Sequence, residues 1–167
     1  MRMQFYDRYE AGEFLAEQLT VYANKPNVIV LALTSGGAAV AFKIARRLHL
    51  PLELLEEGAP DFSPPEIKGQ TIILVDDGIA RDQAMRAAIK DLRTAGARRI
   101  VVAAPVIAAA IYDRIREAAD DVATLIVPEE PYAIGQFYGD FSEVTGSELR
   151  NILRHAARAP RDPAIAA

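Results

Sequence analysis

Short runs of aliphatic, mostly β-branched residues alternate along this chain with longer stretches of helical periodicity, and this alternation restricts the folds available to it. Continuous apolar runs of this length predict strands buried on both faces, with a shorter strand at PLELL. The predicted strands are 27–33, 51–55, 71–75, 99–106 and 122–127. Helical spacing of apolar residues predicts helices at 8–22, 38–48, 84–95, 108–119 and 146–158.

Strands that alternate with helices of this length indicate an α/β fold, a doubly wound and mainly parallel sheet with helices on both faces. The 167 residues suit a single domain over 1–158, and we expect the tail 159–167 to be disordered. Ligands of such sheets bind beyond the carboxyl ends of the strands, where the strand order reverses. Two loops that leave those ends, Thr34–Gly37 and Asp76–Ala84, are therefore the candidate site.

Composition excludes several classes of function. The chain has no cysteine, so it has neither a disulfide framework nor a thiolate nucleophile, and its two histidines, His49 and His155, are too far apart in sequence to suggest a metal centre. A net charge of −4 argues against nucleic acid as the main partner. The arginines at 150, 154 and 158 have helical spacing and predict a solvated basic face.

The chain also lacks the marks of a membrane or secreted protein. Its longest apolar run, VVAAPVIAAAIY at 101–112, contains a proline and is too short to span a bilayer. The N-terminus has an acid within its first seven residues and no apolar h-region, so we expect a cytoplasmic protein without a secretion signal.

Four stretches resemble one known family. ILVDDGIA, followed by a helix and a strand with PV, is similar to the phosphoribosyl-pyrophosphate (PRPP) binding stretch of type I phosphoribosyltransferases, and most similar to a bacterial group with a pattern like VILVDDGIATGATMRAAI. FYDRYEAGEFLAEQL, VIVLALTSGGAAVAFKIARRL and EEPYAIGQFYGDFSEV resemble other parts of the same group, in the same order. The resemblance covers about four fifths of the chain and implies the type I phosphoribosyltransferase fold.

The resemblance also implies roles for particular residues. Catalytic Asp76 and Asp77 would accept hydrogen bonds from the ribose hydroxyls, and a helix N-terminus behind the next loop would favour a 5′-phosphate. Mg²⁺ would arrive with the phosphoribosyl ligand and not in a site made by protein alone. The residues implied in the phosphate loop are Gly78, Ile79, Ala80, Arg81, Asp82, Gln83 and Ala84; those of the pyrophosphate loop are Thr34, Ser35, Gly36 and Gly37; Tyr132 would lie on the acceptor side.

Three departures from the family pattern weaken the implied activity. The phosphate loop has lost both threonines and carries Asp82 in place of a glycine, which we expect to cost about 3–6 kcal/mol of phosphate binding. The pyrophosphate loop, usually similar to PRGG, has no arginine. Only the proline-rich stretch 56–70 stands where related enzymes carry a closing loop, and it is too short for a lid that excludes water.

Asp82 also suggests a structural alternative. We hypothesise that its carboxylate caps the helix that follows, accepting from the first free N–H groups and so occupying the phosphate site from within. Arg81 could offset the loss of phosphate binding, because its guanidinium could contact the phosphate.

The aromatic residues near the C-terminus have two interpretations. They could form the acceptor side of a site, but closing one end of the core is favoured for all except Tyr132. The aromatic residues in question are Tyr132, Phe137, Tyr138 and Phe141. A homodimer is one further arrangement, in which apolar residues at the N-terminus, Phe5 and Tyr6, would be exposed and form the contact.

Three functions compete at this point. The sequence favours a weak or non-catalytic binder of a phosphorylated ribose or a nucleotide, because all three departures affect chemistry while the strand and helix patterns stay orderly. An active PRPP-dependent transferase, with Arg81 replacing the lost contacts, is the first alternative. A non-catalytic assembly partner is the second.

Overall fold

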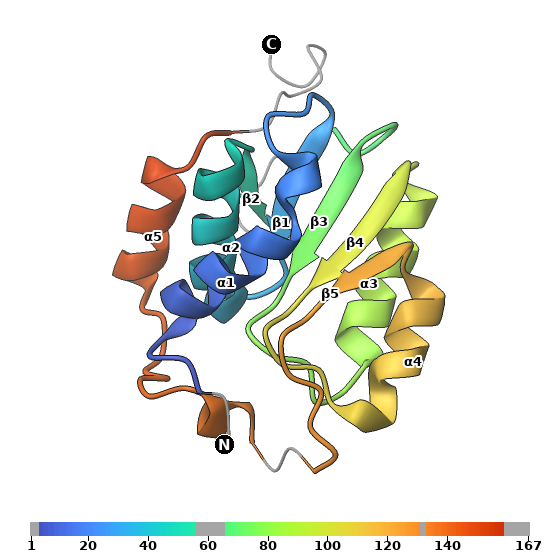
Figure 1. The fold of residues 1–167 in the computed structure, drawn as a ribbon. Helices are drawn as coiled ribbons and strands as arrows, with labels where there is room; N and C mark the ends of the chain where they lie inside the picture. The colour runs from blue at the N-terminus through green and yellow to red at the C-terminus, as the bar shows by residue number, and fades with distance from the viewer. Residues whose placement is uncertain (1–3, 56–65, 131–132, 159–167) are drawn as a thin grey trace.

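The computed structural model describes residues 4–55, 66–130 and 133–158 (Figure 1). Its strands are β1 (Val28–Ala32), β2 (Leu52–Leu54), β3 (Thr71–Val75), β4 (Arg99–Ala103) and β5 (Asp121–Ala123). Its α-helices are α1 (Arg8–Gln18), α2 (Ser35–Leu48), α3 (Gln83–Thr94), α4 (Ala109–Ala118) and α5 (Gly146–His155), with short 3-10 helices η1 (Thr20–Tyr22) and η2 (Ile134–Phe137). The tail 159–167, predicted to be disordered, lies outside the described residues.

All five strands are parallel and form one sheet in the order β2-β1-β3-β4-β5. From β1 the chain crosses to one edge of the sheet, and from β3 it proceeds to the other edge, so the strand order reverses between β1 and β3. Their register pairs Ala32 with Val75, which brings the loops that follow these two strands together. The α/β fold predicted from sequence is confirmed.

The two faces of the sheet are covered by different helices. Helices α1, α2 and α5 lie over one face, and α3 and α4 cover the other (Figure 1). Successive strand residues alternate between these layers: Val28 and Val30 of β1 pack toward α2, whereas Ile29 and Leu31 pack toward α3. The chain therefore has the doubly wound arrangement that its apolar runs predicted.

A third cluster closes the molecule beyond the carboxyl ends of the strands. It joins the N-terminal segment to the segment after β5: the N–H of Phe5 donates to the carbonyl of Phe137 at 2.8 Å. Phe137 and Tyr138 are buried there, as the core-closing interpretation expected. The prediction that Phe5 is exposed is wrong, because its ring packs against Tyr138 and only 1% of the residue remains accessible, while Tyr6 is 69% exposed.

Several element boundaries differ from those predicted. Helix α1 ends at Gln18, helix α5 ends at His155, and α2 begins at Ser35, three residues before the predicted start. Strands β4 and β5 are shorter than predicted and end at Ala103 and Ala123; beyond them, the carbonyl of Pro105 still accepts from the N–H groups of Leu125 and Ile126. Among the described residues, no helix has the length and apolar character required to cross a bilayer.

Candidate functional site

The candidate site lies where the strand order reverses, and its first contact joins the ends of β1 and β3. The hydroxyl of Thr34 donates to Oδ1 of Asp76 at 2.9 Å, and the N–H of Asp77 donates to the same oxygen at 2.9 Å. The parallel register of the two strands sets this contact, since Thr34 and Asp76 follow paired residues. The structure thus brings together the two loops that the sequence analysis singled out.

The loop after β1 forms the first turn of α2. Thr34 is the N-cap in extended conformation, and its Oγ1 accepts from the N–H of Gly37 at 3.0 Å. Gly36 lies so close to Asp77 that a β-carbon at this position would overlap the carboxylate. Because a side chain here would displace the acid, the glycine is required by packing. We call Thr34–Gly37 the capped loop.

Asp77 is tied to a residue that the sequence analysis did not select. Nε of Arg8 lies 3.0 Å from Oδ2 of Asp77, and both side chains are largely buried. Arg8 also donates from Nη1 to the carbonyl of Ser142 at 2.7 Å, and its guanidinium lies 3.9 Å from the centre of the Phe141 ring. The hydroxyl of Tyr138 donates to the backbone carbonyl of Asp77 at 2.6 Å. The second acid is thus held by both the N-terminal helix and the C-terminal segment.

The first acid has a different electrostatic environment. Burial, followed by the neighbouring Asp77 carboxylate, raises the pKa of Asp76 to about 7. Hydrogen bonds from the Thr34 hydroxyl and the Asp77 N–H act in the opposite direction but are outweighed. At neutral pH this acid is therefore near its midpoint of titration, whereas its neighbour is paired with a cation.

The loop after β3 presents unpaired backbone donors. In the part of the chain that the structure describes, the N–H groups of residues 80–84 donate no hydrogen bond to protein atoms. They precede and open α3, whose N-terminus carries partial positive charge. Arg81 is exposed on this loop, and none of the described carboxylates lies within ion-pair distance of it. We call Ala80–Ala84 the open loop.

The hypothesis that Asp82 caps α3 through its carboxylate is wrong. Asp82 occupies the N-cap position, but its backbone is helical, with φ −88° and ψ −10°, and its side chain makes no capping hydrogen bond. The carboxylate is buried instead, 3.3 Å from Nη1 of Arg86 and 3.7 Å from Nη1 of Arg114 on α4. The two arginines therefore compensate the negative charge of Asp82 on the side of the helices. The carboxylate makes no hydrogen bond to the unpaired N–H groups of the open loop.

The remaining predicted residues lie around this centre. Ile79 is buried, and its N–H donates to the carbonyl of Val106 at 2.8 Å, which anchors the start of the open loop. A β-carbon on Gly78 would overlap the side chain of Ile134 in η2, so this glycine allows the C-terminal segment to approach the site closely. Tyr132 and residues 56–65 lie outside the described residues.

The described part of the site offers a metal ion two adjacent carboxylates. No group of three or more histidine, cysteine, aspartate or glutamate side chains that could hold a metal ion is found among the described residues. The adjacent carboxylates of Asp76 and Asp77 are hard oxygen donors of the kind Mg²⁺ accepts, and phosphate oxygens commonly complete its shell. The donor set therefore fits Mg²⁺ delivered with a phosphorylated ligand.

Sequence reasoning did not select Arg8 or Ser142, and it favoured Tyr138 as a residue that closes the core. Arg8 begins α1 and lies 69 positions before its partner Asp77, so no local pattern connects them. Its one available signal was its place directly after the N-cap Asp7, at the start of the helix. In the structure Arg8 is only 9% exposed, and an arginine buried to this extent is unusual unless it has a partner such as Asp77.

Comparison with known proteins identifies relatives in sequence and in fold. A family model described as "Phosphoribosyl transferase domain" matches residues 3–141. The crystal structure of TT1426 from Thermus thermophilus is similar with a TM-score of 0.81 and 30% identity, over 93% of this chain and 100% of that chain. A purine phosphoribosyltransferase from Pyrococcus horikoshii Ot3 shares the fold, with a TM-score of 0.51 and 22% identity over 80% of this chain and 97% of that one.

Two longer proteins are also similar. Both come from Mycobacterium tuberculosis, from strains CDC 1551 and H37Rv, and both carry the name "Putative phosphoribosyl transferase". Each is 27% identical over 210 residues, which cover 92% of this chain and 47% of the relative. The chain therefore spans about half the length of these curated relatives.

Proposed function

We infer a function from the premise that the chain belongs to the phosphoribosyl transferase domain family. We propose that it binds a phosphorylated ribose or a nucleotide at the meeting of the capped and open loops, and that it transfers the phosphoribosyl group weakly or not at all. Asp76 and Asp77 would accept from the ribose hydroxyls, and the open loop would receive the phosphate.

The observation that carries the proposal is the unpaired row of N–H groups in the open loop. Backbone donors at the start of a helix, reinforced by its dipole, bind anions and favour phosphate. Asp82 would repel a phosphate if its charge faced the loop, but it is buried beside Arg86 and Arg114. The cost assigned to Asp82 from sequence is therefore reduced, while the cost of the missing threonine hydroxyls remains.

The expectation of weak transfer has a separate basis. Arg8 holds Asp77 in a largely buried ion pair, so a ribose would share this acid with a guanidinium. The capped loop offers a leaving pyrophosphate only the Ser35 hydroxyl and backbone N–H groups, because the loop has no arginine. Neutral hydrogen bonds of this kind are about half as strong as those made by a charged donor.

One observation favours the alternative of an active transferase. Arg81 is exposed and adjoins the unpaired N–H groups of the open loop, and it has no carboxylate partner among the described residues. A guanidinium there would contribute charge-assisted hydrogen bonds to the 5′-phosphate in place of the threonines.

A calorimetric titration of PRPP with Mg²⁺ into the purified chain at low salt tests the proposal. We expect binding that Asp77→Asn weakens by about tenfold or more, since one charge-assisted acceptor is worth roughly 1.5–3 kcal/mol. Asp91→Asn, a matched change of an exposed aspartate on α3, leaves the affinity unchanged. Absence of binding at millimolar PRPP and at millimolar nucleoside monophosphate would contradict the proposal.

Arg81→Gln then distinguishes the non-catalytic binder from the active transferase. If Arg81 rebuilds the phosphate site, this variant loses PRPP affinity, whereas Arg98→Gln, at an exposed position away from the loop, does not. Release of pyrophosphate in a screen of nucleobase acceptors would establish the active alternative. Binding without any release would support a non-catalytic binder.

A further inference from the structure

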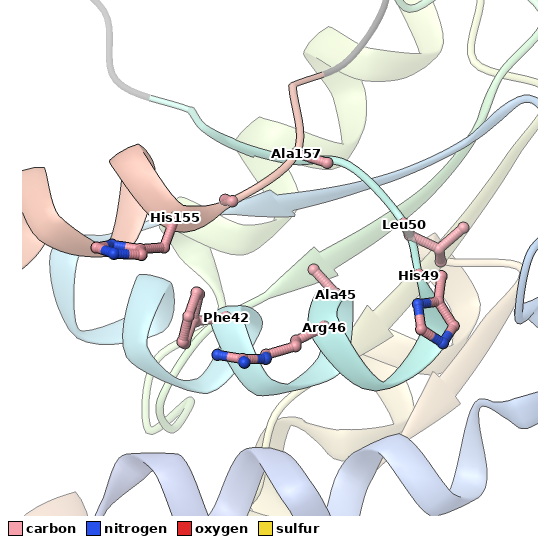
Figure 2. Close-up of a pocket in the computed structure, with 8 residues that line it drawn as sticks. Phe42, Ala45, Arg46, His49, Leu50, His155 and Ala157 are labelled. Atoms are coloured by element: carbon pink, nitrogen blue, oxygen red, sulfur yellow. The ribbon is translucent and has the colours of Figure 1, made fainter.

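A cavity lies on the outer side of α2, under the end of α5 (Figure 2). It has a volume of about 410 Å³, within the range of small-molecule sites. The residues that define it come from α2, from the turn after α2 and from the chain around the end of α5; those used below are Phe42, Arg46, His49, Leu50, His155 and Ala157.

This cavity is separate from the proposed phosphoribosyl site. The capped loop forms the first turn of α2, whereas Arg46 lies in its last turn and His49 follows its end. A helix of 14 residues is about 21 Å long, so the two sites lie at opposite ends of α2. None of the site residues described above lines the cavity.

The floor of the cavity is apolar and fixed. Phe42 is half-buried, while Ala45 and Leu50 are buried in the core beneath it. The wall opposite is held by a backbone hydrogen bond in which the N–H of Leu52 in the edge strand β2 donates to the carbonyl of Ala157 at 2.9 Å. A flat apolar group could therefore rest on Phe42 without rearrangement of the backbone.

The rim of the cavity carries one arginine and two imidazoles. The guanidinium of Arg46 lies 5.9 Å from the centre of the Phe42 ring, and none of the described carboxylates lies within ion-pair distance of it. His155 uses Nδ1 in a 2.8 Å contact with the carbonyl of Asn151, which leaves Nε2 for another partner. Figure 2 shows His155 and His49 toward opposite ends of the cavity, with Arg46 between them.

The absence of acids from the lining is informative in an acidic chain. The protein has 23 acidic and 19 basic residues, yet the residues that line this cavity include no aspartate or glutamate. An adjoining hollow of about 500 Å³ shares Phe42, Arg46 and His155 and adds Lys43, again without an acid. Lys43 is paired with Glu13 at 3.5 Å, whereas Arg46, which also lines a hollow that contains Glu13 and Glu17, is not within ion-pair distance of either.

His49 adds an independent indication. It ends α2 in the left-handed conformation, with φ 54° and ψ 50°, a position where helices favour glycine. Residues held in this region at some energetic cost often serve a function. A glycine would relieve the strain but would remove the imidazole from the cavity.

We propose that this cavity is a second binding site, distinct from the phosphoribosyl site, for an anion that carries an aromatic ring, such as a nucleoside monophosphate. The ring stacks on Phe42 at the apolar floor. The phosphate meets Arg46, and His155 and His49, at opposite ends of the cavity, make further polar contacts with the ligand.

The experiment uses the fact that both histidines of the chain, His49 and His155, line this cavity. The histidine ring signals in NMR spectra of the full chain therefore report on this site and not on the phosphoribosyl site. AMP is titrated first, followed by adenosine, which lacks the phosphate, and inorganic phosphate, which lacks the ring. We expect AMP to shift the ring signals in a saturable manner, with a Kd of about 1 mM or tighter, and the other two to bind about tenfold more weakly or less.

Substitutions locate the contacts. Arg46→Gln should weaken AMP binding by about fivefold or more, since a charge-assisted hydrogen bond is lost. Its matched control is Arg47→Gln, the neighbouring exposed arginine of α2 that does not line this cavity. His49→Gly should raise thermal stability and weaken AMP binding, observed through the ring signals of His155. This variant remains foldable because glycine suits the backbone at that position.

Three results would overturn the proposal. AMP could leave both ring signals unchanged at concentrations that saturate the phosphoribosyl site. Inorganic phosphate could shift them as effectively as AMP, which would indicate an unspecific cationic rim. Finally, Arg47→Gln could weaken binding as much as Arg46→Gln, which would reduce the effect to the general charge of the surface.

Discussion

The capped loop and the open loop occupy equivalent places in the fold, yet they treat their helix N-termini in opposite ways. Each follows an inner strand of the sheet and begins a helix beyond the carboxyl ends of the strands. The hydroxyl of Thr34 accepts from the N–H of Gly37 in the first turn of α2 and donates to Asp76. Asp82, at the corresponding position before α3, turns its carboxylate away to two arginines and leaves the backbone donors unpaired.

The difference shows that the residue type at an N-cap does not decide whether the cap is made. Threonine and aspartate are both favoured at N-caps. Thr34 has an extended backbone that directs its oxygen back over the first turn, while Asp82 has a helical backbone that directs its side chain along the helix. The backbone donors at the start of α3 stay unpaired because the nearby arginines of α3 and α4 hold the acid elsewhere.

The largest effect on stability is expected from the ion pair that holds Asp77 beside the capped loop. Arg8→Ala leaves the Asp77 carboxylate largely buried without its cation and should lower the free energy of unfolding by about 3 kcal/mol. Denaturant unfolding measures the loss, and Lys43→Ala, which breaks the more exposed pair with Glu13, should cost under about 1 kcal/mol. Equal costs for the two variants would show that the Arg8 pair contributes no more than a surface contact.

The next effect depends on pH. Because the pKa of Asp76 is raised to about 7, the folded state holds a proton that the unfolded chain, with a pKa of 3.8, has released. The stability associated with this proton is fully present below pH 3.8 and is lost as the pH rises through 7. Asp76→Asn should therefore raise the free energy of unfolding at pH 8 by about 1–2 kcal/mol.

Thermal unfolding at pH 8 and pH 4 checks this prediction. Asparagine retains an oxygen that can accept from Thr34 and from the Asp77 N–H, so a gain at pH 8 that disappears at pH 4 isolates the charge. A gain of the same size at both values would mean that the charge of Asp76 is not its cause.

On the open side, the orientation of Asp82 can be tested by removing its partners. Replacing Arg86 and Arg114 together by alanine leaves the acid uncompensated beside the open loop and should weaken binding of a phosphorylated ligand about tenfold. Calorimetry with PRPP measures the change. Adding Asp82→Asn to the double variant should restore the affinity for PRPP. If the double variant binds PRPP as tightly as the wild type, Arg86 and Arg114 do not compensate the charge of Asp82.

The smallest effect concerns the cap itself. Thr34→Val keeps the shape of the side chain but removes the oxygen that accepts from Gly37, which should cost about 1 kcal/mol of stability. Thr34→Ser keeps that oxygen and should cost much less. Equal losses in thermal unfolding would attribute the role of Thr34 to the packing of its methyl group.

Much of the fold was available from local patterns. Continuous apolar runs mark the buried strands, and 3.6-residue periodicity marks α3, in which Met85, Ala88, Ile89 and Leu92 are buried; both patterns depend on neighbours a few positions apart. The same patterns placed Thr34–Gly37 and Asp76–Ala84 beyond the carboxyl ends of the strands, because parallel strands bring these ends together.

By itself, then, the sequence determined the family, the layered sheet and the two loops of the candidate site, since each is specified by residues close along the chain. Only the tertiary structure decided that Arg8 neutralises Asp77, that Phe5 is buried under Tyr138 and that Asp82 faces Arg114. These pairs join segments separated by tens or more than a hundred residues, so their contacts arise from the packing of complete elements and leave no periodic signal.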